Sequence, residues 1–95
     1  MAQIFTTDRK IENEGGIISE FITAARQIRY NAEAIAPHYN EMAAWERKEY
    51  ESCHADNVAI FNSAKAKMMN FESTFNELLF KYNMSVAVFI CKYGI

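Results

Sequence analysis

Apolar residues over 17–35 recur in steps of three and four, the spacing of one face of an α-helix. The residues of this seam are Ile18, Phe21, Ala25, Ile28, Ala32 and Ile35. A seam this narrow is typical of helices that pack as in a coiled coil, and its small central residues would let a second helix approach closely. We therefore predict a helix over 17–35 that ends before Pro37, because the residue preceding a proline is pushed out of the α region.

A second stripe with the same spacing runs over 38–82. Its first half is weak, because polar residues fall on it, and its second half is rich in Phe and Leu. One interpretation is a single long helix. We favour two helices, over 38–55 and 56–82, because Ser, Asp and Asn cluster at 52–57 and prefer caps to helix interiors.

The two ends of the chain have weaker patterns. Residues 1–16 read as irregular chain, a short strand or a short helix, with a β-prone stretch at Gln3–Thr7. Segment 85–93 is rich in β-branched and aromatic residues, so we expect a strand there, paired with Gln3–Thr7; a short buried helix is the alternative. The fold class expected is mainly α, a small helical bundle or hairpin of two to four helices with an optional short β element.

Composition narrows the class of protein further. The 95 residues suit one domain, and 51% hydrophobic residues with only 3 Gly and 1 Pro favour long helices. A net charge of −2 argues against a generic nucleic-acid binder, which normally carries a basic stripe. No apolar run approaches the roughly 20 residues of a membrane span, and the first residues lack a signal-peptide pattern. We expect a cytoplasmic domain with free thiols.

Motifs for catalysis or metal binding are absent from the sequence. It contains no P-loop, no Gly-rich dinucleotide loop and no Cys-x-x-Cys. Cys53 and His54 are adjacent, but neighbours on a helix point about 100° apart and cannot readily form a nucleophile–base pair. We expect a buried Cys53 beside a surface His54, and neither His38 nor Cys91 stands at zinc-ligand spacing from them. The prediction is therefore no enzyme, no metal and no cofactor.

Two groups of side chains are candidates for binding. The first is an aromatic group outside the expected core: Tyr39, Trp45, Arg47 and Tyr50. Tyr, Trp and Arg commonly anchor interfaces, so this group predicts a partner or oligomer contact, with extra packing inside the fold as the alternative. The second group lies off the first seam: Arg26, Arg29 and Tyr30. It could hold a phosphate, a nucleotide or an acidic surface, unless Arg29 pairs locally with Glu33.

These patterns favour a non-catalytic protein–protein interaction module that also self-associates. The first helix is shorter than the second stripe, so one chain cannot cover all its apolar faces, and a second copy would cover the rest. Small helical proteins without motifs include phage-encoded inhibitors of host or defence machinery, which is an analogy of size and class. The alternative function is a nucleotide- or nucleic-acid-binding regulator that uses Arg26, Arg29 and Tyr30. The carboxylates over 45–51 alternate with cations and are expected on a solvated face.

Overall fold

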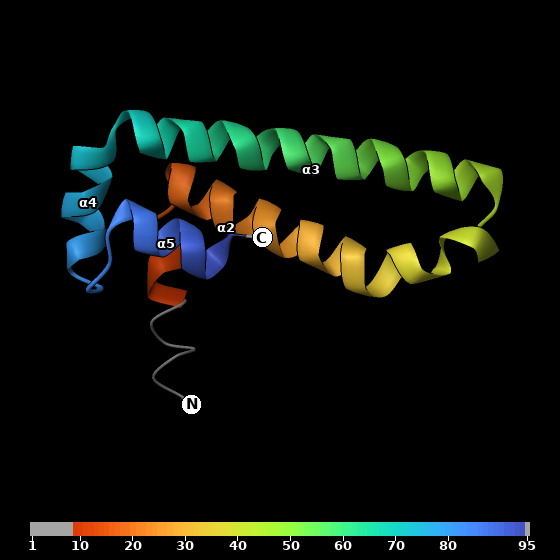
Figure 1. Cartoon of the computed structure of the whole chain (residues 1–95), viewed down its shortest axis with the longest axis horizontal. Helices are drawn as coiled ribbons and strands as arrows, with labels where there is room; N and C mark the ends of the chain where they lie inside the picture. Colours follow the sequence, from red (N-terminus) through yellow and green to blue (C-terminus); the bar gives the residue numbers. More distant parts are fainter. Residues whose placement is uncertain (1–8, 95) are drawn as a thin grey trace.

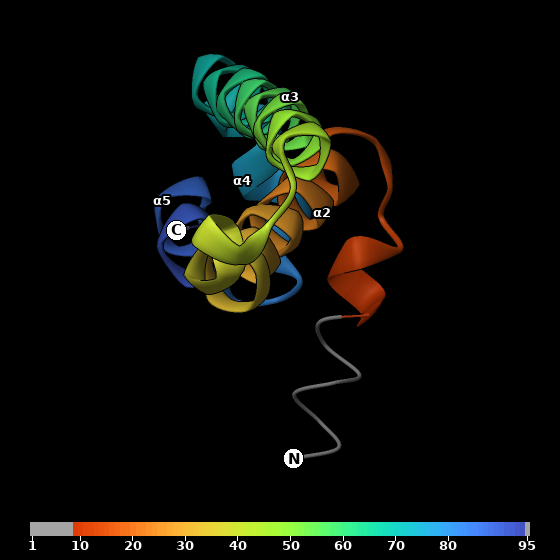
Figure 2. The same cartoon turned by 90° about the vertical axis from the view of Figure 1, so that its right-hand side faces the viewer.

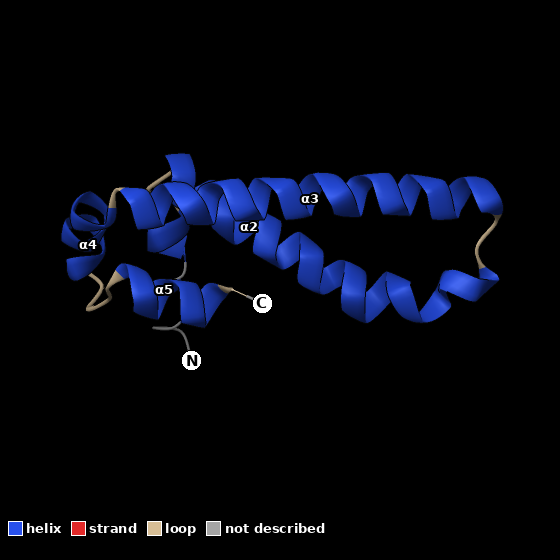
Figure 3. Ribbon diagram, turned by 45° about the horizontal axis from the view of Figure 1, so that its top comes forward, coloured by secondary structure: helices blue, strands red, loops and turns tan. Residues whose placement is uncertain are grey.

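The computed structural model describes residues 9–94, and within that range all regular elements are helices (Figure 3). After a helical turn at residues 9–12 come α2 (Gly16–Tyr30), a π-helix η1 (Asn31–Ile35), a 3₁₀-helix η2 (Ala36–Glu41), α3 (Ala44–Asn70), α4 (Glu72–Phe80) and α5 (Val86–Tyr93). The mainly α class is confirmed. The stretch Gln3–Thr7 lies outside the described residues. Within them, no helix is both long and apolar enough to cross a membrane.

The architecture is an antiparallel hairpin of α2 and α3, with α4 and α5 gathered at one end and η1 and η2 at the other (Figure 1). Seen along the hairpin, α5 and residues 9–12 flank α2 from opposite sides (Figure 2). The molecule is elongated: it measures 46 × 33 × 19 Å, and its radius of gyration of 15.3 Å exceeds the about 13 Å of a compact 100-residue domain. The hairpin end at 31–58 projects beyond α4 and α5 (Figure 1). We call residues 31–58 the arm.

The hydrophobic core lies at the other end of the hairpin. Its fully buried members are Ile11, Ile18, Phe21, Ile22, Ala64, Met68, Leu79, Val86 and Phe89. Phe21 lies at the centre, with its ring 4.8 Å from that of Phe61 and 5.4 Å from that of Phe89. Each fully buried Phe contributes about 1.5–3 kcal/mol. No member of this cluster comes from the arm, so the arm is held by the packing of one helix on another.

The first predicted helix keeps its seam only as far as Ile28. Beyond it the backbone widens into η1, where Asn31 continues the face of Ala24 and Ile28 and is buried, whereas Ala32 of the predicted seam is exposed. The predicted end at 35 coincides with the end of η1, but the chain does not leave the helical path there, because it continues through Pro37 as η2. A proline has no N–H and crowds the carbonyl four residues earlier, and a π-turn before it relieves both problems without ending the helical path.

The favoured break at 52–57 is also wrong. Helix α3 is continuous there, and the chain bends instead at Phe71, with φ −114° and ψ 43°. Ser52 and Asp56 are exposed on α3, so their side chains do not compete with the backbone hydrogen bonds of the helix. The bend at Phe71 turns the chain so that Leu79 of α4 enters the core. The single helix over 38–82 is excluded by the same bend.

The strand expected at 85–93 is a helix, as the alternative interpretation had it. Asn83 has φ 58° and lies in the turn after α4, whose C-cap is Lys81, so the left-handed residue follows the helix end. Two side chains then satisfy the first amides of α5: Asn76 Oδ1 accepts from the Val86 N–H at 2.7 Å, and Ser85 Oγ accepts from the Val88 N–H at 3.3 Å. These caps start a helix in a sequence that is β-prone by composition. Its inner face packs against α4 and α3, and Phe89 also meets Phe21 of α2.

Candidate protein-interaction groove

The turn of the arm is tied by three of the four residues predicted as an interface. Arg47 donates from Nε to the Tyr39 carbonyl at 3.0 Å and from Nη2 to the Asn40 carbonyl at 2.9 Å. Its guanidinium also lies 5.2 Å from the centre of the Tyr39 ring, a cation–π distance. The rings of Tyr39 and Tyr50 meet edge to face at 6.1 Å. These contacts give Tyr39, Arg47 and Tyr50 a role in holding the turn.

Trp45 is the fourth residue of that group, and 69% of its surface is exposed. It stands in the first turn of α3, two residues after the N-cap Ala43. The Glu46 carboxylate accepts from the Ala43 N–H at 3.0 Å, which fixes the start of the helix. This cap fixes the first turn of α3 and with it the position of Trp45, whose indole stays exposed.

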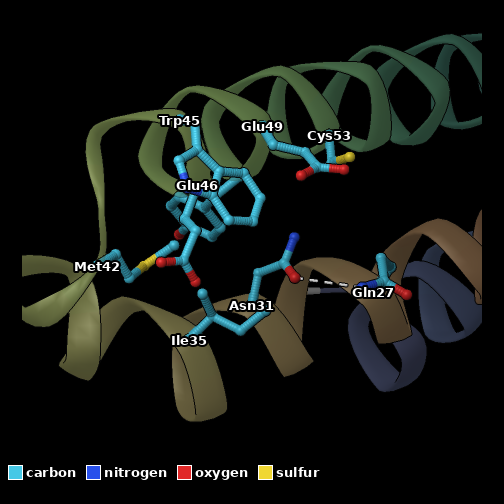
Figure 4. Close-up of a pocket in the computed structure, with 9 residues that line it drawn as sticks. Gln27, Asn31, Ile35, Met42, Trp45, Glu46, Glu49 and Cys53 are labelled. Atoms are coloured by element: carbon cyan, nitrogen blue, oxygen red, sulfur yellow. Dashed lines mark hydrogen bonds between the residues drawn. The ribbon is translucent and has the colours of Figure 1, made fainter.

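A pocket of about 380 Å³ lies beside Trp45 between the two helices of the arm (Figure 4). Its lining residues are Gln27, Asn31, Ile35, Met42, Trp45, Glu46, Glu49, Tyr50 and Cys53. We call it the Trp45 pocket. Figure 4 shows side chains from α2 and η1 on one side and from α3 on the other. The walls are mostly apolar, with two carboxylates at the α3 side.

Asn31 is the polar residue buried most deeply in this region, with 2% of its surface exposed. Its Oδ1 accepts from Gln27 Nε2 at 3.2 Å. Its Nδ2 has no hydrogen-bond partner among the described residues, and it points into the pocket (Figure 4). An unsatisfied buried donor costs about 1–3 kcal/mol, so this amide favours a state of the pocket that contains an acceptor.

Two further hollows continue along the same side of the hairpin. They are lined by Ser19, Glu20, Thr23, Ala24, Asn57, Ala59, Ile60 and Ser63. The α2 residues at 20, 24, 27 and 31 share one helical face, so the three hollows form a row that we call the hairpin groove. Among the described residues that line it, the charged ones are Glu20, Glu46 and Glu49, and none is a cation. The groove is apolar with an acidic edge.

The environments of Cys53 and His54 are the reverse of those expected. Cys53 is exposed at the pocket wall, whereas His54 is partly buried with its ring stacked 5.8 Å from that of Tyr50. The phase of α3 is set by Ala64 and Met68 in the core, and this phase turns Cys53 toward the groove. Within residues 9–94, both cysteines are free thiols, and no group of three His, Cys, Asp or Glu is placed to hold a metal ion.

The second predicted group lies on the other side of α2. Arg26 pairs with Glu12 at 2.8 Å, and Arg29 Nη2 donates to the Gly94 carbonyl at 3.1 Å, not to Glu33. A hollow of about 230 Å³ there is lined by Ile22, Arg26, Arg29, Lys92 and Tyr93. Tyr30 is exposed but does not line it. Lys92 and Tyr93 were not predicted for this site, because segment 85–93 was expected to be a strand.

The groove itself was visible in the sequence only through Trp45. Tyr50 also lines it and was predicted with Trp45, but the remaining residues were not grouped by any sequence pattern, because the groove arises from the way the two helices pack. Comparisons with models of protein families, with curated proteins and with solved structures find no match to this chain.

Proposed function

We propose that this chain is a non-catalytic protein-interaction module whose hairpin groove binds an amphipathic helix of another protein. The observation that carries the proposal is the hairpin groove itself, a row of hollows between α2 and α3 that leads to the arm, where Trp45 stands exposed at its outer end. Apolar grooves between helices accept the apolar face of a third helix, and buried Trp side chains are common hot spots.

Such binding would let the chain act as a regulator or inhibitor, because a helix held in the groove is withheld from other contacts. This is also how a small phage-type inhibitor of host or defence machinery could work, an extension that rests on size and class alone. The core end of the molecule serves as the rigid base, since Phe21 ties α2 to both α3 and α5. The binding residues then sit on helices whose start and phase are fixed.

We further propose self-association, at the α4 end of the molecule and not in the groove. Two copies meeting groove to groove would bring acidic edges together, which is unfavourable. The side chains that flank α4 are more suitable: Phe71 is exposed, and Phe80 has 78% of its surface exposed, more than any other large apolar residue described. Exposed apolar side chains of this kind favour an interface between copies.

The groove proposal is tested by photo-cross-linking in the cells that naturally make the protein. A photoreactive phenylalanine analogue replaces Trp45 in one variant and Val88 in the other. Val88 is a matched control, because it is also apolar and half exposed but lies on α5. We expect a discrete cross-linked protein from position 45 and none from position 88. The absence of any cross-link at position 45 would contradict the proposal.

A second candidate function is binding of a small phosphate-containing anion, and the Arg26–Arg29–Lys92 hollow favours it. Three cations from two helices converge there, and only one of them, Arg26, is paired with a carboxylate of the described residues. Arg forks and Lys point charges are the usual phosphate ligands. Tyr30, which does not line the hollow, is dropped from this candidate site.

Thermal unfolding with and without pyrophosphate tests this candidate. An anion that binds only the folded state must raise the melting temperature with its concentration. Arg29→Gln should abolish the increase, whereas Lys67→Gln, an equal change of charge at an exposed position of α3, should keep it. Equal responses of the two variants would mean that only general charge is involved.

A further inference from the structure

We infer that the Trp45 pocket receives a cationic side chain, Lys or Arg, carried by the partner helix. This inference rests on the proposed function and names the chemistry of the partner. The pocket combines an exposed indole with the Glu46 and Glu49 carboxylates, and it contains no cation of its own. An aromatic face with carboxylates beside it is the arrangement that attracts ammonium and guanidinium groups.

The two carboxylates are not equally available. Glu46 already accepts from the Ala43 N–H at the start of α3. Glu49 is exposed, lines the pocket one helical turn after Trp45, and has no hydrogen bond or ion pair with a described residue. The two cations that precede it in the chain are Lys48, which does not line the pocket, and Arg47, which is held on the Tyr39 and Asn40 carbonyls. Glu49 is therefore the carboxylate left for the partner's charge.

Asn31 adds a second requirement on the occupant. Its free Nδ2 is a donor on the α2 side of the pocket, opposite Trp45 (Figure 4). A cation cannot accept this hydrogen bond, whereas a side-chain or backbone carbonyl of the partner can. The fitting occupant is an amphipathic helix with apolar residues along the groove, a Lys or Arg at Trp45, and a carbonyl or amide oxygen near that position. The acidic edge at Glu20 extends the same preference for a basic partner.

The test uses two synthetic helical peptides that differ only in the terminal group of one side chain. Both have a leucine stripe, and one carries Arg within the stripe where the other carries citrulline, which has the same shape without the charge. Trp45 is the chain's only tryptophan, so its fluorescence reports occupancy of the pocket directly. We expect the Arg peptide to bind about tenfold more tightly, from the cation–π contact and a partly exposed ion pair together.

The variants locate the effect. Glu49→Gln should remove most of the preference for Arg, whereas Glu77→Gln, which makes the same change of charge on α4, should leave it intact. The preference should also shrink at high salt, because the ion pair is partly exposed. Equal binding of the two peptides overturns this inference and leaves the interaction module standing. If neither peptide changes Trp45 fluorescence, the inference is overturned together with the helix-binding groove.

Discussion

Glu14 and Lys81 form an ion pair that joins the start of the described chain to the segment after α4, with Glu14 Oε1 and Lys81 Nζ 2.5 Å apart. The Tyr82 hydroxyl donates to the same carboxylate. The hydrogen bonds from Lys81 and Tyr82 lower the pKa of Glu14, and the carboxylate in turn raises the pKa of both partners. This cluster ties residues 9–14 onto the core end, where Ile11 is buried.

The first prediction is an acid-sensitive contribution to stability from Glu14. A carboxyl group whose pKa is lower in the folded than in the unfolded state stabilises the fold above the unfolded pKa, near 4.5, and loses this effect as the pH falls through the folded value. Melting temperatures of the wild type should therefore fall between pH 5 and pH 3, as estimated from ordinary carboxyl behaviour. Glu14→Gln should flatten this part of the profile.

The control for this prediction is Glu77→Gln, whose acid profile should follow that of the wild type. The same linkage gives a second window at high pH. Lys81 and Tyr82 have raised pKa values, so their contribution is present below about pH 10 and is lost as the pH rises through the folded values. If the melting temperature of Glu14→Gln followed that of the wild type at both low and high pH, the stabilising role of the Glu14 cluster would be contradicted.

The second prediction concerns the unsatisfied amide of Asn31. Asn31→Leu replaces a buried polar side chain by an apolar one of similar size, so the penalty for the orphan donor disappears. Gln27 loses its acceptor but is exposed and can bond to water. We expect an unchanged or raised melting temperature in the free protein. A loss of more than about 2 kcal/mol in chemical denaturation would show that Asn31 is already satisfied.

The third prediction concerns the core end. Phe89 is fully buried and packs against both Phe21 and Tyr93, at ring distances of 5.4 and 5.0 Å. Phe89→Ala should reduce the free energy of unfolding by about 3–5 kcal/mol, the usual cost of deleting a buried Phe. Its neighbour Val88 is half exposed, so Val88→Ala should change it by less than about 1 kcal/mol. Urea denaturation of both variants measures the difference.

The sequence predicted the parts of the fold that depend on regular spacing. The seam of α2 was readable from Ile18 to Ile28, since those residues face the core in an undistorted helix. The break in α3 was misplaced because exposed polar residues at 52–57 imitate a cap. The true bend lies at Phe71, because α4 has to reach the core from there. This is a relation between distant segments of the chain, which local helix propensity does not predict.

The candidate site was predicted only in part for a similar reason. Trp45 was identified because a large aromatic residue outside the expected core is noticeable in any sequence. Tyr39 and Arg47 were assigned to the same surface, but the turn of the arm uses them internally. Asn31 and Glu49 carry no signal of their own, because the packing of α2 and η1 against α3 decides that they face a pocket.

The last prediction is that copies of the chain associate at the α4 end, independently of the groove. Phe71 and Phe80 are exposed on either side of α4, and burying each in an interface would contribute about 1.5–3 kcal/mol. Sedimentation equilibrium at micromolar to millimolar concentration should show a species heavier than the 11.0 kDa monomer. Phe80→Ser should weaken this association at least tenfold and leave the melting temperature of the dilute monomer nearly unchanged, because Phe80 lies outside the core.

Trp45→Ala is the matched control for that measurement. It removes an equally exposed aromatic side chain from the opposite end of the hairpin, so self-association should keep its wild-type constant. A weakened dimer in Trp45→Ala, with Phe80→Ser unaffected, would place the second copy in the hairpin groove. If the wild type is a monomer at every concentration, the proposal of self-association is wrong. The groove then remains available to a different protein.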